Sequence, residues 1–330
     1  MDFPSATPLL SIVVPCYDEE EVFPELQAAL CEVAKELEPE YEVEFVLVDD
    51  GSRDGTWAAI RAFARVDPRV RGVALSRNFG HQMALTCGYD VARGDAVVSL
   101  DADLQDPPEL IPRLIEAWRD RRADVVYAVR VRRDGDTLFK RASAAVFYRV
   151  MRWMGASNVR EASGDFRLLS RRALDALREM SEQHRFVRGM VGWIGFQTAE
   201  IEYERRPAVG GSSKYSLRRM IHLAMDAAVS FSIFPLRLTF VFAGLLSLIV
   251  LGYVAHAAFS WLVFGVEMVP GWMSLLISIM AFGALNLVCI GIMGEYVGRI
   301  YEQAKGRPLY LVRERVGESP SEPRNVGSAK

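Results

Sequence analysis

Short apolar runs alternate with helical patterns along the first part of the chain. Apolar runs bounded by turn residues are typical of buried strands, and apolar residues three or four positions apart indicate an amphipathic helix. The runs predict strands at residues 10–15, 43–48, 70–75, 96–99, 125–129 and 199–204, the last of them at a sheet edge. Strands that alternate with helices favour a mostly parallel sheet covered by helices, which is an α/β fold.

The C-terminal part has two long stretches without charged residues. The first covers residues 238–254 and stays apolar to Phe264, and the second covers residues 272–293. At roughly 20 residues per crossing, each is long enough to span a bilayer. The alternative is a pair of buried core helices. Arginine and lysine residues precede the first stretch and follow the second, while the connection carries only Glu267. This asymmetry favours a membrane hairpin with both termini in the cytoplasm.

These patterns divide the chain into four parts. We expect an α/β domain over residues 1–213, a juxtamembrane amphipathic helix over 214–235, two transmembrane helices at about 236–264 and 272–297, and a cytoplasmic tail over 298–330 that is disordered from about 317. Within the first part, residues 137–154 interleave aromatic and basic side chains. That pattern is typical of a helix in the membrane interface, and a helix lying on the sheet is the open alternative.

Composition disfavours several classes of protein. The formal net charge of -3 gives no general attraction to nucleic acid, so we expect no nucleic-acid partner. The four cysteines are scattered without a C-x-x-C pair, which excludes the common zinc spacings and favours a reducing compartment. The first residues lack the basic and apolar regions of a secretory signal peptide. No G-x-G-x-x-G turn follows the first predicted strand and no Walker A loop is present, which disfavours the common dinucleotide and nucleoside-triphosphate folds.

The most informative polar stretch follows the predicted strand at residues 96–99. Asp101 and Asp103 lie two positions apart, so both side chains point the same way along an extended backbone, and Gln105 follows one step further. Two carboxylates and an amide oxygen suit Mg²⁺ or Mn²⁺, which would bind substrate phosphates. The alternative is a plain acidic turn. In either case Asp106 is expected to cap the helical pattern that Pro107 begins.

Polar residues also end the other predicted strands. Asp49 ends the second strand, where its carboxylate either accepts hydrogen bonds from a nucleoside or caps the next helix. Arg77 follows the third strand and can meet a phosphate, whereas His81 at the start of the next helix is expected to be structural. Arg130 begins a basic cluster that suits an anion, with a solvated basic loop as the alternative.

Several of these stretches, in this order, resemble glycosyltransferase family 2, which has the GT-A fold, a Rossmann-like and mostly parallel sheet. The motifs are Val14-Pro15-x-Tyr17-x-Glu19, Asp49-Asp50-Gly51-Ser52-x-Asp54-Gly55-Thr56 and Asp101-Ala102-Asp103-Leu104-Gln105. The Ser76-Arg77-Asn78-Phe79-Gly80-His81 segment and the paired apolar stretches narrow the resemblance to polyisoprenyl-phosphate glycosyltransferases. Within these the chain is similar to bactoprenol (undecaprenyl-phosphate) glucosyltransferases, which are related to dolichol-phosphate mannose synthase. The resemblance covers about residues 10–312 and departs from the family at Asp18, where relatives often have Asn.

The resemblance, together with the polar residues above, indicates roles for individual positions. The indicated donor-binding residues are Pro15, Tyr17, Glu19, Asp50, Arg77 and Asp101. The indicated metal ligands are Asp101, Asp103 and Gln105, with action of Asp101 through the nucleoside left open. The indicated catalytic residues are Asp101, Asp103, Asp165, Arg205 and Lys214. Asp165 would position the acceptor or take a proton from it. The indicated acceptor-phosphate residues are Arg130, Lys140, Arg141, Ser213 and Lys214.

The resemblance implies a membrane-bound, inverting enzyme that uses Mg²⁺ or Mn²⁺. It would transfer a hexose from a nucleotide sugar to undecaprenyl phosphate on the cytoplasmic face, with UDP-glucose as the expected donor. The lipid-linked sugar would then serve to modify a surface glycan. The Gln-x-x-Arg-Trp motif of processive synthases is absent, which favours a single transfer.

Two alternatives remain open at this stage. The first is the same reaction with an N-acetylhexosamine, mannose or aminoarabinose donor. The second is a non-catalytic nucleotide-sugar sensor, which the intact acidic motif disfavours. A homotetramer is implied by the resemblance alone.

Overall fold

The computed structural model of this chain describes residues 7–130, 163–183, 185–204, 234–264 and 271–317. The chain divides into two compact units. One unit holds the sheet and includes the chain from Arg307 onward, and the other holds two long helices. The interfacial helix expected at 137–154, most of the juxtamembrane helix expected at 214–235 and the tail from residue 318 lie outside the described residues.

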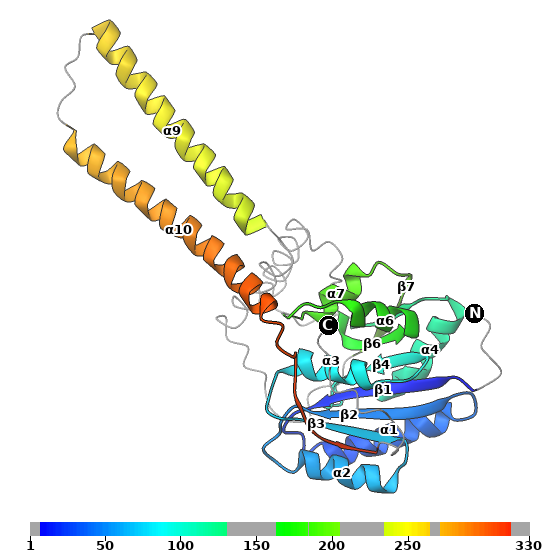
Figure 1. The fold of residues 1–330 in the computed structure, drawn as a ribbon. Coiled ribbons are helices and arrows are strands. Elements are labelled where there is room, and N and C mark those ends of the chain that lie inside the picture. Colours follow the sequence, from blue (N-terminus) through cyan, green and yellow to red (C-terminus); the bar gives the residue numbers. More distant parts are fainter. Residues whose placement is uncertain (1–6, 131–162, 184, 205–233, 265–270, 318–330) are drawn as a thin grey trace. The chain divides into compact units, whose positions relative to one another are not determined.

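The first unit is built around one mixed sheet of eight strands in the described part of the chain (Figure 1). Their bounds are β1 Leu9–Cys16, β2 Glu42–Asp49, β3 Val70–Leu75, β4 Ala96–Ser99, β5 Val125–Arg130, β6 Ser163–Ser170, β7 Thr198–Tyr203 and β8 Val312–Val316. They are arranged in the order β7-β5-β6-β4-β1-β2-β3-β8. The strands β4, β1, β2 and β3 are parallel neighbours, as are β5 and β7, whereas β6 and β8 are antiparallel to their neighbours. The predicted α/β architecture is therefore confirmed.

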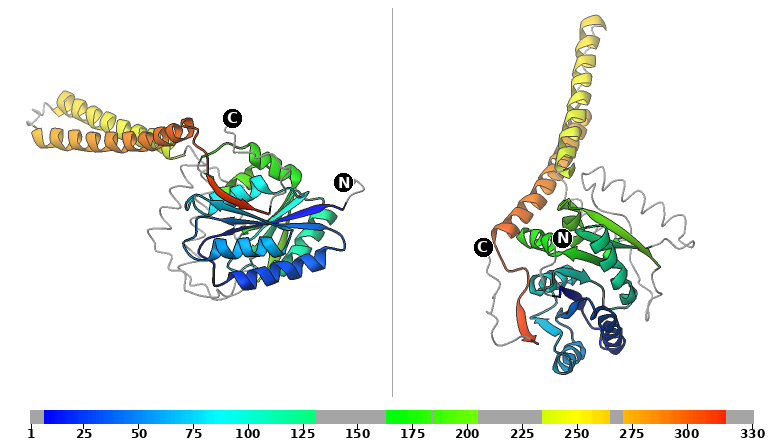
Figure 2. Two further views of the ribbon diagram at one scale, coloured as in Figure 1. Left: turned by 60° about the horizontal axis from the view of Figure 1, so that its bottom comes forward. Right: turned by 90° about the vertical axis from the view of Figure 1, so that its right-hand side faces the viewer.

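Helices cover both faces of this sheet (Figures 1 and 2). Their bounds are α1 Phe23–Leu37, α2 Thr56–Val66, α3 His81–Val91, α4 Ile111–Asp120, α6 Arg171–Glu179 and α7 Val187–Trp193, with a short 3₁₀ turn η1 at Pro108–Leu110. Helices α1, α2 and α4 share one apolar cluster with the sheet, and α3, α6 and α7 share the other. The layers are therefore helix, sheet and helix.

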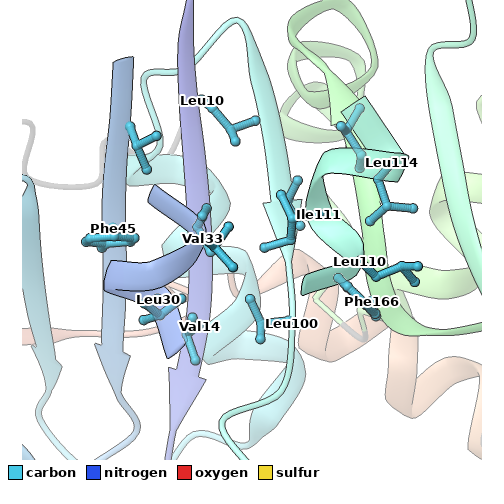
Figure 3. Close-up of a cluster of buried hydrophobic side chains, with 14 of the residues drawn as sticks. Leu10, Val14, Leu30, Val33, Phe45, Leu100, Leu110, Ile111, Leu114 and Phe166 are labelled. Carbon is cyan, nitrogen blue, oxygen red and sulfur yellow. The ribbon is translucent and has the colours of Figure 1, made fainter. Parts of the chain in front are cut away.

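The alternation of side chains along each strand explains the two clusters. In β1, Ile12 and Val14 belong to one cluster and Val13 to the other, because successive side chains point to opposite faces. Figure 3 shows Val14 and Phe45 of the sheet beside Leu30 of α1. Each fully buried side chain of this size contributes about 1.5–3 kcal/mol to folding. A strand buried on both faces therefore reads as a continuous apolar run in the sequence.

Two strands differ from the sequence-based expectation, because neither β6 nor β8 was predicted. The strand β6 carries Asp165 and Arg167 in its interior, and β8 has three consecutive charged residues between two valines. Their charges concealed the strand pattern, since single-sequence reasoning treats a charged position as exposed. The structure shows that Asp165 and Arg167 are both buried and form an ion pair with each other.

The second unit consists of α9 (Phe234–Phe264) and α10 (Trp272–Ala304). Both are long and apolar enough to cross a membrane, with candidate spans at Thr239–Val263 and Ser278–Ala304. Within the described residues neither span is buried, which argues against the alternative of two core helices.

Candidate active site

The polar motifs meet because three parallel strands end at one edge of the sheet. The strand β1 lies between β2 and β4, with Cys16 beside Asp49 and Val13 beside Ser99. The segments that follow these strands carry Tyr17 and Glu19, Asp50, and the Asp101–Gln105 stretch respectively. The carboxyl ends of parallel strands form the usual ligand site of an open α/β sheet.

The loops after β1 and β2 are joined by hydrogen bonds between side chains and the backbone. The Asp18 amide donates to Ser52 Oγ at 3.0 Å, and the Glu19 amide donates to Thr56 Oγ1 at 2.9 Å. Asp18 has a φ of 53°, a left-handed conformation that Asp and Asn tolerate better than most residues. Its carboxylate accepts a hydrogen bond from the Arg53 amide at 2.8 Å. Tyr17 beside it remains 39% exposed, so its ring is accessible to a ligand.

Asp50, predicted to bind the donor, holds the neighbouring loop in the structure. Its two carboxylate oxygens accept hydrogen bonds from the backbone amides of Phe79 at 2.7 Å and Gly80 at 2.9 Å. In the same loop, the Arg77 guanidinium stacks over the Phe79 ring at 4.0 Å. Gly51 is required beside it, because a Cβ there would lie 2.4 Å from the carbonyl carbon of Arg77. Asp50 therefore positions the loop that carries Arg77.

The Asp101–Gln105 stretch forms a tight turn. The Gln105 amide donates to Asp103 Oδ1 at 3.0 Å, and Leu104 between them has a φ of 53°, which is uncommon for a leucine. Asp101 Oδ1 is buried and accepts no hydrogen bond from any described residue. An orphaned carboxylate oxygen of this kind fits a cation ligand, so the residues present suit the Mg²⁺ or Mn²⁺ expected from the sequence.

Two acidic groups at this edge, Glu19 and Asp101, have raised pKa values. Burial is the main cause that raises the pKa of Glu19 to about 7, and the charges of Asp103, Asp54 and Asp101 add to it. Burial also raises the pKa of Asp101. Carboxylates that repel one another in this way form a site that favours a bound cation.

We expect Glu19→Gln to stabilise the metal-free protein at pH 8 but not at pH 4.5. In the folded protein Glu19 keeps its proton up to about pH 7, while the unfolded chain loses it near pH 4.3. Folding therefore becomes less favourable as the pH rises through this interval. Allowing for solvent screening, we expect a gain of about 1 kcal/mol, or about 2–4 °C in melting temperature. Thermal unfolding with EDTA measures it.

The matched control for this prediction is Glu116→Gln on the exposed face of α4. It should show no gain at either pH. Added Mg²⁺ should reduce the gain of Glu19→Gln, because a cation stabilises the ionised carboxylates. An equal gain at pH 4.5 and pH 8 would contradict the electrostatic cause.

Asp165 joins this edge through the antiparallel strand β6. Ser99 of β4 pairs with Arg167 of β6, so the beginning of β6 lies beside the end of β4. Asp165 Oδ2 lies 3.1 Å from His81 Nε2, and Asp101 Oδ1 lies 3.5 Å from the same nitrogen. Ligand atoms of His81, Asp101 and Asp165 all lie within 4.8 Å of one another and could hold a metal ion. His81, which the sequence analysis treated as structural, is therefore part of the site.

The charges around Asp165 decide what this residue can do. Arg167 Nη2 lies 2.5 Å and Arg188 Nε 3.1 Å from Asp165 Oδ1. Burial disfavours the charged form, but His81, Arg167 and Arg188 outweigh it and hold the pKa of Asp165 far below its ordinary value. Burial and the charge of Arg188 lower the pKa of His81, but the hydrogen bond to Asp165 and the charges of Asp101 and Asp165 outweigh them and raise it. A carboxylate held this way is a weak base, so positioning is the role that the structure favours.

Asp106 was expected to cap a helix, and the structure corrects this. The 3₁₀ turn begins at Pro108 without a side-chain cap, and Asp106 is fully buried. Its carboxylate accepts a hydrogen bond from the Tyr203 hydroxyl at 2.5 Å and pairs with Arg130 Nη2 at 3.2 Å. Arg130, predicted to bind the acceptor phosphate, therefore has Asp106 as its partner in this structure.

Of the predicted residues not yet placed, Pro15 lies within β1. Arg205, Lys140, Arg141, Ser213 and Lys214 lie outside the described residues. Conversely, His81, Arg167 and Arg188 reach the site without having been selected from the sequence. His81 could have been selected from the sequence, because it directly follows the segment after β3 that carries Arg77. Arg167 lies two positions from Asp165 on β6, so its pairing with Asp165 is local, but β6 itself was not predicted. Arg188 gave no signal, because only the folding of α7 against the sheet brings it to Asp165.

A mostly parallel sheet with acidic residues after the ends of β1, β2 and β4 has the layout of the GT-A glycosyltransferase fold expected from the sequence. The model for glycosyl transferase family 2 matches residues 11–178, and the chain belongs to this family. The chain is therefore a glycosyltransferase.

Its relatives match over nearly their whole lengths. An uncharacterized glycosyltransferase of Bacillus subtilis (strain 168) is 43% identical over 308 residues, which are 93% of this chain and 94% of the relative. The bactoprenol glucosyl transferase of Shigella phage SfX is 41% identical over 306 residues, which are 93% of this chain and 99% of the relative. A prophage bactoprenol glucosyl transferase homolog of Escherichia coli (strain K12) is 38% identical over 304 residues, which are 92% of this chain and 98% of the relative.

Proposed function

We propose that the protein transfers glucose from UDP-glucose to undecaprenyl phosphate at the cytoplasmic face of a membrane. The observation that carries this proposal is the extent of similarity to the Shigella phage bactoprenol glucosyl transferase, 99% of which is covered at 41% identity. The similarity thus includes the apolar helices as well as the sheet. The acidic strand-end site and the two helices long enough to cross a membrane both suit a nucleotide-sugar donor and a lipid acceptor.

In the proposed reaction an oxygen of the acceptor phosphate attacks the anomeric carbon of the sugar. A new carbon–oxygen bond forms as the bond to the nucleoside diphosphate breaks, and the electron pair leaves with the diphosphate. Attack in line inverts the anomeric configuration. A phosphate monoester has its second pKa near ~6, so the acceptor is largely ionised at neutral pH and needs no strong base. The depressed pKa makes Asp165 a weak base, which is consistent with a reaction that needs no strong base.

The residues of the site divide this work between them. Tyr17 and the loop held by Asp50 would bind the nucleoside diphosphate, with Arg77 as a phosphate contact. Asp101, Asp103 and Gln105 would hold Mg²⁺ or Mn²⁺, which when bound would neutralise charge on the leaving diphosphate. His81, Asp101 and Asp165 form a second possible ligand set. Arg205, Ser213, Lys214, Lys140 and Arg141 remain predicted contacts of the phosphates. Positioning and charge stabilisation would supply most of the rate enhancement.

The proposed setting is an integral membrane protein with both termini and the sheet domain in the cytoplasm. The flanking positive charges of the apolar helices support this topology. A homotetramer remains a prediction from the resemblance. The lipid-linked sugar would serve the modification of a surface glycan by other proteins.

The test uses full-length protein in detergent with undecaprenyl phosphate, Mg²⁺ or Mn²⁺ and a panel of UDP- and GDP-sugars. We expect UDP release and a glucosyl lipid from UDP-glucose, both abolished by EDTA, as measured by nucleotide assay and mass spectrometry. A lipid product that carries N-acetylhexosamine, mannose or an aminoarabinose derivative would replace the donor and keep the reaction. Nucleotide binding without a lipid product from any donor would favour a sensor.

A further inference from the structure

The chain that follows the two apolar helices returns to the sheet as the strand β8. This strand pairs antiparallel with β3 and forms an edge of the sheet (Figures 1 and 2). Side chains reinforce the pairing: Glu314 Oε2 accepts a hydrogen bond from Trp57 Nε1 at 2.8 Å, and the Tyr310 hydroxyl donates to Asp90 at 2.8 Å. The Ser76 amide donates to the Leu311 carbonyl oxygen at 2.8 Å. The strand is thus attached to α2, α3 and β3, next to the loop that carries Arg77.

The strand β8 brings a positive charge to Asp49, which lies at the end of β2. Asp49 is fully buried, and its Oδ1 accepts a hydrogen bond from the Ser52 amide at 3.1 Å. Its Oδ2 is buried and has no hydrogen-bond partner among the described residues. Arg313 Nη2 of β8 lies 3.6 Å from this oxygen. A buried carboxylate needs a compensating charge, and Arg313 supplies one.

Asp49 also connects directly to the donor loops. Ser52, whose amide Asp49 binds, accepts a hydrogen bond from the Asp18 amide through its own hydroxyl. Asp18 lies between Tyr17 and Glu19, and Asp50 follows Asp49. A continuous path of contacts therefore runs from Arg313 through Asp49 and Ser52 to the loop that carries Tyr17.

We propose that Arg313 is a positioning residue for the nucleotide donor, supplied by the chain segment that follows the apolar helices. By neutralising Asp49, Arg313 keeps the Asp49–Ser52–Asp18 contacts in place and so holds the donor loops in their binding conformation. Arg313 acts through Asp49 and does not touch the sugar. The inference rests on the proposed function in one respect, namely that a nucleotide sugar binds at the carboxyl ends of β1, β2 and β4.

The test compares Arg313→Ala and Arg313→Lys with Glu314→Gln in the full-length protein. Glu314→Gln is the matched control, because it removes the ion pair of β8 with Arg61 on α2 while the amide oxygen can still accept from Trp57. For each variant the Kd of UDP is measured by calorimetry, together with kcat, the KM of UDP-glucose, the KM of undecaprenyl phosphate and the melting temperature.

We expect Arg313→Ala to raise the Kd of UDP and the KM of UDP-glucose about three- to tenfold, because Arg313 is partly exposed and its charge is partly screened. The kcat and the KM of the lipid should stay within about twofold. Arg313→Lys should recover most of the affinity, and Glu314→Gln should bind UDP like the wild type. The double variant Arg313→Ala/Asp49→Asn should lose less affinity than the two single effects combined, since the unpaired charge is gone.

An unchanged UDP affinity in Arg313→Ala would overturn the inference while leaving the proposed function intact. Equal loss in Arg313→Ala and Glu314→Gln would also overturn it, because the strand would then act only by its attachment. If the wild type forms no lipid product but Arg313→Ala still weakens UDP binding, the proposed function fails and the inference holds. Binding of neither UDP nor GDP to the wild type would overturn both.

Discussion

Asp103→Asn is expected to reduce sugar transfer by at least about 10²–10³-fold while leaving the protein folded. Removal of one preorganised group that stabilises charge in a transition state typically costs about 10²–10³ in kcat. The asparagine side chain has the same shape, and its carbonyl oxygen can still accept the hydrogen bond from the Gln105 amide. The change therefore removes a charge and keeps the turn. Initial rates of glucosyl-lipid formation at several Mn²⁺ and Mg²⁺ concentrations measure the effect.

The matched control is Asp120→Asn, an exposed aspartate at the end of α4 whose ion pair with Arg119 lies at the surface. It should transfer sugar at the wild-type rate and melt at the wild-type temperature. Metal-dependent turnover at the wild-type level in Asp103→Asn would contradict the assignment of Asp103 as a metal ligand. The set of His81, Asp101 and Asp165 would then be the ligand set to examine.

Among the variants considered, Asp165→Asn is expected to lower the free energy of unfolding the most. The substitution removes the negative charge that faces Arg188 and the fully buried Arg167. Breaking a buried ion pair from one side costs about 3–5 kcal/mol, which corresponds to on the order of 10 °C in melting temperature. Thermal unfolding of the full-length protein at pH 7 measures it. Because the folded-state pKa is depressed, the stabilisation by Asp165 is present at neutral pH and is lost as the pH falls below about 4.

Asp175→Asn is the control for this prediction. Asp175 also pairs with two arginines, Arg171 and Arg178, but its side chain is 53% exposed. Exposed pairs contribute less than about 1 kcal/mol, so this variant should melt within a few degrees of the wild type. If Asp165→Asn melts like Asp175→Asn and loses only its transfer activity, Asp165 has a direct chemical role instead of a positioning one.

Much of the fold could be predicted because local sequence carries the physical cause. Strands such as 43–48 are buried on both faces and therefore read as apolar runs, interrupted here only by Glu44. The strands β6 and β8 could not be recognised in this way, because Asp165 and Arg167 occupy interior positions and β8 is a short charged edge strand. Asp165 and Arg167 pair with each other within β6, but their burial and the further partners of Asp165 and of β8 arise only after distant segments pair.

The sequence by itself determined that acidic residues follow the ends of successive parallel strands. The order of strands along the chain and the spacing of the motifs can both be read from the local sequence. It thereby placed Glu19, Asp101 and Asp103 at one edge of the sheet. Only the tertiary structure decided the partners of these and neighbouring charges. It paired Asp106 with Arg130 and Tyr203, Asp165 with His81, Arg167 and Arg188, and Asp49 with Arg313. The physical reason is that a buried charge is tolerated only beside a partner, and all of these partners except Arg167 come from segments far from their partner in the chain.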